Sequence, residues 1–118
     1  MVETPASRSV RAPAEVVDQL MVADAFSRWL GIEVLEADVG RSVLRMTVRD
    51  EMVNGFGTSH GGIVFSLADS AFAFAINAGG FLSVAIDCSV SFPVAVRPGD
   101  VLTATGIEDS TRTNSRSA

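Results

Sequence analysis

Apolar residues recur at three- and four-residue spacing in the stretch that follows Pro13. This spacing is typical of an α-helix that buries one face. Glycine at position 31 would close such a helix, because glycine readily adopts the left-handed conformation found at helix ends. The pattern predicts one amphipathic helix that ends near Leu30 and covers an edge of the core.

Two strands are predicted next, over residues 32–37 and 41–50, with a turn at residues 38–40. The second strand alternates apolar with polar side chains: Leu44, Met46 and Val48 against Arg45, Thr47 and Arg49. One face of this strand should pack while the other meets solvent. Such alternation favours an antiparallel sheet.

The most apolar segment, residues 61–80, follows a loop rich in glycine and small polar residues. Its length is close to that of a membrane span, but it carries Asp69, two serines and Asn77. We therefore predict a buried core helix that starts near Gly62, and no membrane association.

Residues 81–92 alternate clearly and predict a further strand, and residues 100–107 predict one more after a connection that contains Pro98 and Gly99. Residues 1–11 are expected to form a loose tail. Residues 108–118 contain no apolar side chain larger than alanine and are expected to be disordered. The order predicts a single α+β domain over residues 1–118, with an antiparallel sheet wrapped around the apolar helix.

Composition excludes several classes of protein. The chain has 118 residues, a net charge of −5 and no basic block that could neutralise nucleic-acid phosphates. One cysteine and one histidine cannot form an intrachain disulfide or a zinc site of three or four such ligands. The first twenty residues hold no apolar run typical of a signal peptide. We expect a cytoplasmic protein without metal, cofactor or nucleic-acid partner.

Candidate chemistry gathers at the start of the predicted core helix. The sequence His60-Gly61-Gly62 would place unpaired backbone N–H groups at a helix N-terminus, where they can hold a developing oxyanion. The same residues could also form only a tight turn. Asp69 lies about two turns further along, among apolar or small neighbours, which suits a general base or a carboxylate nucleophile. A carboxylate held by hydrogen bonds from other elements is the structural alternative.

Other motifs are weaker. Ser59 or Ser66 with His60 and Asp69 could form a hydrolytic triad, but no G-x-S-x-G motif is present. The glycine spacing matches neither a dinucleotide nor a P-loop motif. Asn54 could orient water or a carbonyl through its amide, or simply form a turn with the glycine that follows.

The residues from Asn54 to Phe72, including GTSHGGIVFSLADSAF, together resemble the signature of the hotdog-fold acyl-CoA thioesterases. The closest similarity is to their phenylacetate-degradation branch. It runs from about Phe26 to Thr105 and includes the later sequence RPGD. The resemblance implies a hotdog fold and homodimers or homotetramers whose active sites are shared between two chains.

By this resemblance, the N–H of Gly61 polarises the thioester carbonyl. Asp69 of the other chain activates water or attacks the carbonyl carbon directly. Asn54 and His60 orient water, loop or carbonyl, while Gly62 and Ser70 are expected near the substrate.

Two departures from the family pattern stand out. Phe56 lies where close relatives often have a polar residue, so it is expected to affect substrate fit. Relatives also continue past the RPGD strand into two further strands, which are missing before Ala118.

The sequence therefore predicts hydrolysis of an aryl or medium-chain acyl-CoA, such as phenylacetyl-CoA, to the free acid and coenzyme A. The alternatives are a non-catalytic hotdog protein that binds acyl-CoA or serves in assembly, inactive through its short end, and a hotdog dehydratase that uses His60 and Asp69 as an acid–base pair.

Overall fold

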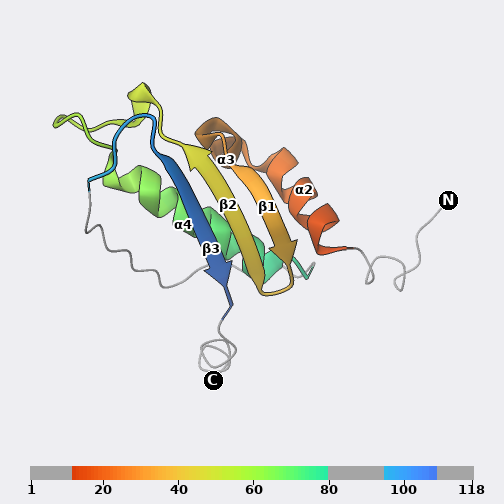
Figure 1. The fold of residues 1–118 in the computed structure, drawn as a ribbon. Coiled ribbons are helices and arrows are strands. Elements are labelled where there is room, and N and C mark those ends of the chain that lie inside the picture. The colour runs from red at the N-terminus through yellow and green to blue at the C-terminus, as the bar shows by residue number, and fades with distance from the viewer. Residues whose placement is uncertain (1–11, 80–94, 109–118) are drawn as a thin grey trace, which may run out of the picture.

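A computed structural model describes residues 12–79 and 95–108 of the chain (Figure 1). Its elements are helices α2 (Pro13–Ala23), α3 (Ala25–Leu30) and α4 (Gly61–Asn77), strands β1 (Glu33–Asp38), β2 (Arg41–Thr47) and β3 (Val101–Ile107), and the short 3₁₀ turn η1 (Asp50–Met52). The strand predicted over residues 81–92 and the predicted tails at 1–11 and 109–118 lie outside the described residues. Glu108 was assigned to the tail, but its N–H donates to the carbonyl of Gly40 at 2.8 Å and so extends the sheet.

The described strands form an antiparallel sheet in the order β1-β2-β3. Helix α4 runs along one face of this sheet, and α2 lies beside β1 (Figure 1). The predicted α+β architecture with a long apolar helix against an antiparallel sheet is therefore confirmed. The alternation predicted from residue 44 onward is confirmed as well, because Leu44, Met46 and Val48 are 0%, 1% and 2% exposed while Thr47 is exposed.

The single N-terminal helix was a wrong prediction. Asp24 separates α2 from α3, since its carboxylate accepts hydrogen bonds from the N–H of Ser27 at 2.9 Å and from the hydroxyl of Ser27 at 2.7 Å. An aspartate at this position starts a new helix by satisfying a free N–H of its first turn. The predicted end of the helix at Gly31 is confirmed by its left-handed φ of 77°.

Strand β2 is shorter than predicted and ends at Thr47 rather than at residue 50. Residues 50–52 turn into η1 instead, while Val48 still exchanges hydrogen bonds with Gly99 and Asp100. The turn before β3 uses the RPGD sequence, with Gly99 at φ 91° and the Asp100 carboxylate accepting from the N–H of Arg97 at 2.9 Å. Proline followed by a glycine with positive φ is typical of a type II turn.

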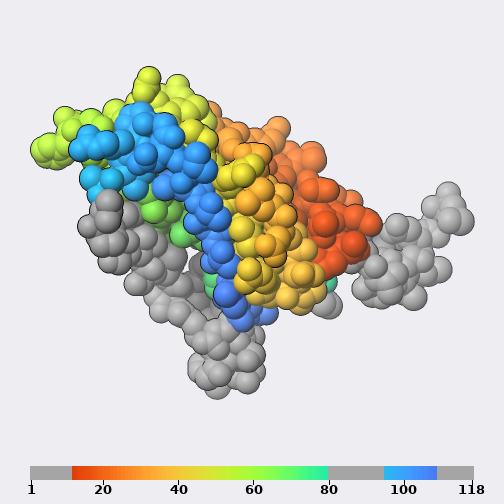
Figure 2. Space-filling view, in the orientation of Figure 1, coloured from red at the N-terminus to blue at the C-terminus, as the bar shows by residue number. Residues whose placement is uncertain are grey.

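The face of the sheet turned away from α4 forms the surface seen in Figure 2. On it, Arg45 Nη2 lies 3.1 Å from Glu33 Oε2, and the two residues are paired in the β1–β2 register. The hydrogen bond from Arg45 and the attraction of its guanidinium hold the pKa of Glu33 below its usual value. Because this pair lies in water, it favours the register more than it adds to stability.

Helix α4 touches the sheet backbone to backbone at Gly106. Gly106 of β3 lies so close to α4 that a methyl group there would overlap the carbonyl of Ala71 and press on the N–H of Phe72. Ser42, the β2 residue paired with Gly106, donates its hydroxyl to the same Ala71 carbonyl at 2.5 Å. This contact fixes the depth and rotation of α4 on the sheet.

Among the described residues, no helix has the length and apolarity needed to cross a membrane. Within the same residues there is also no group of three or more His, Cys, Asp or Glu side chains placed to hold a metal ion.

We predict that Gly106→Ala lowers the free energy of unfolding by about 1–3 kcal/mol, because the added methyl group must push α4 off the sheet. Gly55→Ala is the matched control, since a methyl group at that glycine meets nothing within 4 Å. Urea denaturation at one fixed protein concentration measures both. Equal stability of the two variants would contradict the close contact at Gly106.

Candidate active site

The loop that leads into α4 is organised by Asn54. Its side-chain oxygen accepts hydrogen bonds from the N–H of Phe56 at 2.9 Å and of Thr58 at 3.3 Å, and its amide donates to the Thr58 hydroxyl at 3.2 Å. Such bonds from an asparagine to the residues just after it form a turn. The amide of Asn54 therefore holds the loop rather than lying free to orient water in this chain. Phe56 projects from the loop with 92% of its surface exposed.

His60 caps the N-terminus of α4. Its ring Nδ1 accepts a hydrogen bond from the N–H of Gly62 at 3.0 Å, and the backbone N–H of His60 donates to the carbonyl of Met52 at 2.8 Å. An accepting Nδ1 leaves the ring proton on Nε2. The N–H of Gly62 is consequently occupied by the cap, which leaves Gly61 as the donor to consider.

Gly61 is the first residue of α4 and is exposed. An N–H at this position has no acceptor inside its own helix. No hydrogen bond from it occurs within residues 12–79 and 95–108. Among the described residues, nothing pairs with this backbone donor at the positive end of a 17-residue helix.

Asp69 lies on α4 with its side chain in an exposed position, not among buried apolar groups as the sequence suggested. It is eight residues after Gly61, which corresponds to about 12 Å along the helix axis. One carbonyl group cannot contact both residues of the same chain over that distance. If Asp69 and Gly61 act on one substrate, the two residues must come from two chains.

Ser70 points into the protein. It is 8% exposed, and its hydroxyl lies 2.8 Å from that of Ser27, which is in turn bonded to Asp24. This chain of hydrogen bonds joins α4 to the start of α3. In the described structure the Ser70 hydroxyl is therefore bonded to Ser27 and is not free to contact a substrate.

The two serines considered for a triad are engaged elsewhere. The Ser66 hydroxyl donates to the carbonyl of Gly62 at 2.7 Å, and the Ser59 hydroxyl donates to the carbonyl of His60 at 3.3 Å. In the part of the chain that the structure describes, neither hydroxyl bonds to the imidazole of His60. This geometry gives no support to a serine nucleophile.

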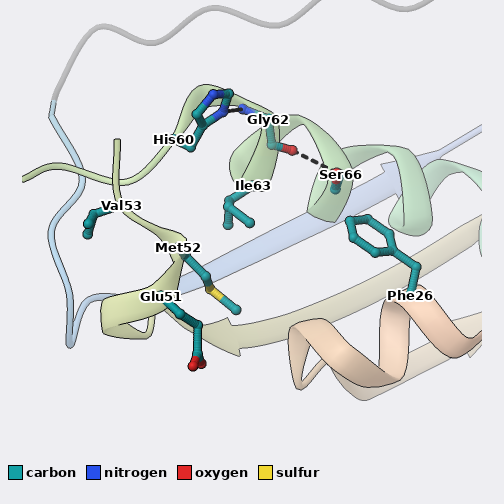
Figure 3. A pocket seen from close by; sticks show the side chains of 8 residues that line it. All are labelled: Phe26, Glu51, Met52, Val53, His60, Gly62, Ile63 and Ser66. Carbon is teal, nitrogen blue, oxygen red and sulfur yellow. Dashed lines mark hydrogen bonds between the residues drawn. The ribbon is translucent and has the colours of Figure 1, made fainter. Parts of the chain in front are cut away.

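Two hollows of about 350 Å³ each flank the His60–Gly62 turn. The first is largely apolar and lies between α3, the η1 turn and the first turns of α4, with Phe26 and Ser66 on one side and Met52 on the other (Figure 3). The second is lined by Asn54, Thr58, Ser59 and Gly61, together with Val64 and Val96. The exposed helix end therefore lies between an apolar and a more polar hollow.

Sequence reasoning identified His60, Gly62 and Ser66 but missed Phe26 and Met52 as lining residues of the apolar hollow. Phe26 lies in the stretch that was predicted as one amphipathic helix, but the break at Asp24 puts it on a separate short helix, where it is 53% exposed. Met52 was treated as part of an irregular loop, although η1 buries it to 2% exposure. Residues Phe26 and Trp29, three apart on one helix, were the available signal for an aromatic surface.

Comparison with known proteins gives consistent results. Residues 56–115 match the family described as the thioesterase superfamily. The acyl-coenzyme A thioesterase PaaI of Escherichia coli (strain K12) is 46% identical over 82 residues, which cover 70% of this chain and 59% of that protein. A putative esterase of Archaeoglobus fulgidus is 38% identical over 75% of this chain and 58% of its own length. The chain thus spans less than three fifths of these curated relatives.

Among solved structures, that of the E. coli PaaI protein from the phenylacetic acid degradation operon superposes with a TM-score of 0.76. It is 41% identical, and the match covers 79% of this chain and 67% of that one. The sheet and central helix described above are therefore those of a hotdog fold of the PaaI type.

We predict that His60→Ala lowers the free energy of unfolding by about 0.5–2 kcal/mol, because α4 loses its side-chain cap. His60→Asn should retain most of that stability, since asparagine is a good capping residue. Thermal and urea unfolding of the two variants measure the difference. If both variants lose the same stability, the cap is not what His60 contributes to the fold.

Proposed function

Because the chain belongs to the thioesterase superfamily, in its PaaI-type hotdog branch, we propose that it hydrolyses an acyl-CoA thioester to a carboxylic acid and coenzyme A. The observation that carries this proposal is the N–H of Gly61 at the start of α4, which lies between the two hollows and has no acceptor among the described residues. A preorganised donor at a helix N-terminus stabilises the negative charge that develops on a carbonyl oxygen under attack.

In this proposal the thioester carbonyl oxygen accepts a hydrogen bond from the backbone N–H of Gly61. The carboxylate of Asp69 from a second copy of the chain either takes a proton from a water molecule that attacks the carbonyl carbon, or attacks that carbon itself to form an anhydride that water then opens. In both routes the C–S bond breaks, the acid keeps the new oxygen, and the thiolate of coenzyme A takes up a proton. Removing one donor of this kind costs about 10²–10³-fold in rate in enzymes where it was tested.

A homodimer is the smallest assembly that this proposal allows. The helical distance of about 12 Å between Gly61 and Asp69 prevents one chain from presenting both to one carbonyl. The exposure of Asp69 in the single chain agrees with a role against a partner. We propose a homodimer, or a tetramer of two such dimers, with active sites at the contact between copies.

The remaining predicted residues act as positioning residues in this proposal. Asn54 holds the loop that precedes α4, and His60 caps α4 so that the N–H of Gly61 points outward. Neither side chain needs to touch the reacting atoms. Gly62 lines the apolar hollow, whereas Phe56 projects from the loop with 92% of its surface exposed.

The acyl group is proposed to be aryl. Two observations support this choice. The E. coli structural relative is a PaaI protein from the phenylacetic acid degradation operon, and the apolar hollow of this chain carries an aromatic side chain. Phenylacetyl-CoA is accordingly the first substrate to test.

We predict that the chain releases free thiol from phenylacetyl-CoA and that Asp69→Asn lowers kcat by at least about 10²-fold, since the amide can neither accept a proton nor attack. Asp18→Asn, the same change at an exposed position of α2, is the control and should keep full activity. A thiol-reactive dye measures turnover over a panel of acyl-CoAs. Substantial hydrolysis by Asp69→Asn would overturn the proposed mechanism. No hydrolysis of any acyl-CoA in the panel by the unaltered chain would overturn the proposed activity.

A further inference from the structure

We propose that Phe26 is the residue of this chain that sets its preference for aryl acyl groups, by forming one wall of the pocket that receives the acyl chain. The inference deepens the proposed thioester hydrolysis and rests on it. Its basis is a linked set of side chains, Phe26, Trp29, Arg49 and Glu51, that spans the two walls of the apolar hollow.

The hollow has the size and lining of a small acyl pocket. Its volume of about 350 Å³ lies at the lower end of the range for ligand sites. Figure 3 shows the ring of Phe26 across from Met52 and Ile63, with Ser66 between Phe26 and the start of α4. A phenyl ring fits between an aromatic face and a thioether, because both make favourable contacts with aromatic rings.

Charge favours an apolar acyl group over an acidic one. The described residues that line the hollow include no lysine or arginine, and its one carboxylate is that of Glu51. An acyl group that ends in a carboxylate would find no lysine or arginine on this lining, and the guanidinium of Arg49 beside it is already paired with Glu51. The second hollow is more polar, since Thr58, Ser59 and Asn54 lie on its lining, and it suits the polar arm of coenzyme A better than an aryl ring.

Phe26 is held in place from the opposite wall. Its ring stacks on Trp29, with 6.1 Å between centroids and 10° between planes. Arg49 contacts Trp29 twice: its guanidinium carbon lies 4.8 Å from the centre of the Trp29 ring, and its Nη2 donates to the Trp29 carbonyl at 2.6 Å. Arg49 Nε also pairs with the carboxylate of Glu51. Glu51 and Met52 belong to η1, the other wall. The distance between the walls is thus fixed by contacts between side chains.

The aromatic pair is also costly to leave in water. Phe26 and Trp29 are 53% and 48% exposed on the six-residue helix α3. Contiguous exposed apolar surface is typical of ligand-binding grooves and of interaction sites. An aryl group bound there would cover the face of Phe26 that α3 leaves open.

The test compares kcat and KM for phenylacetyl-CoA and acetyl-CoA in the unaltered chain, Phe26→Leu and Phe26→Ala. Leucine keeps apolar volume but removes the ring. We expect the ratio of kcat/KM for phenylacetyl-CoA to that for acetyl-CoA to fall about five- to tenfold, mainly through KM, which is the size of one aromatic contact. Val22→Ala, a 73% exposed position on α2, should leave the ratio unchanged. An unchanged ratio in Phe26→Leu, or equal losses on both substrates, would overturn the proposal.

A binding measurement separates this inference from the proposed activity. Trp29 is the only tryptophan, so its fluorescence reports on the pocket. We expect a saturable change on titration with the phenylethyl thioether of coenzyme A, which cannot be hydrolysed, and a Kd about five- to tenfold weaker in Phe26→Leu. If the thioether binds in this way but no acyl-CoA is hydrolysed, the activity is wrong and the pocket stands. The same Kd in both proteins, or no saturation in the unaltered chain, would overturn the pocket.

Discussion

The close contact between α4 and the sheet at Gly106 determines how the remainder of the described structure is arranged. Only a residue without a side chain lets the helix backbone reach β3, and the Ser42 hydroxyl then bonds the same carbonyl of Ala71. Helix and sheet cannot slide past each other while both contacts hold. With this depth fixed, the N-terminus of α4 meets the loop held by Asn54, and Phe26 faces Met52 across the apolar hollow.

Regular patterns in the sequence predicted the sheet and the long helix well. The alternation around Leu44 and the glycine at position 31 depend on local backbone geometry, which neighbouring residues in the sequence reveal. The break at Asp24 was missed because it depends on a side-chain bond to Ser27 that competes with an otherwise helical pattern. The pocket was missed because its walls come from segments far apart in the chain, and no periodicity reports that kind of proximity.

The candidate site was predicted in part. The start of α4 and its free donor followed from the His-Gly-Gly sequence, but the capping role of His60 and the turn made by Asn54 required atomic contacts. The burial predicted for Asp69 was wrong for the single chain because the sequence does not show which side of α4 the sheet covers. That exposed carboxylate, distant from Gly61 on one helix, is the strongest physical reason to look for a second copy.

Complementation between two inactive variants tests this shared site most directly. Gly61→Pro removes the N–H but keeps the helix, because proline is favoured at the first helical position and His60, at φ −60° and ψ 136°, already has the conformation required before proline. Asp69→Asn removes the carboxylate and leaves Gly61 intact. The account predicts that each variant alone is inactive on phenylacetyl-CoA and that activity returns when the two are unfolded and refolded together. If the mixture stays inactive although mixed oligomers form, Gly61 and Asp69 do not complete one site between two chains.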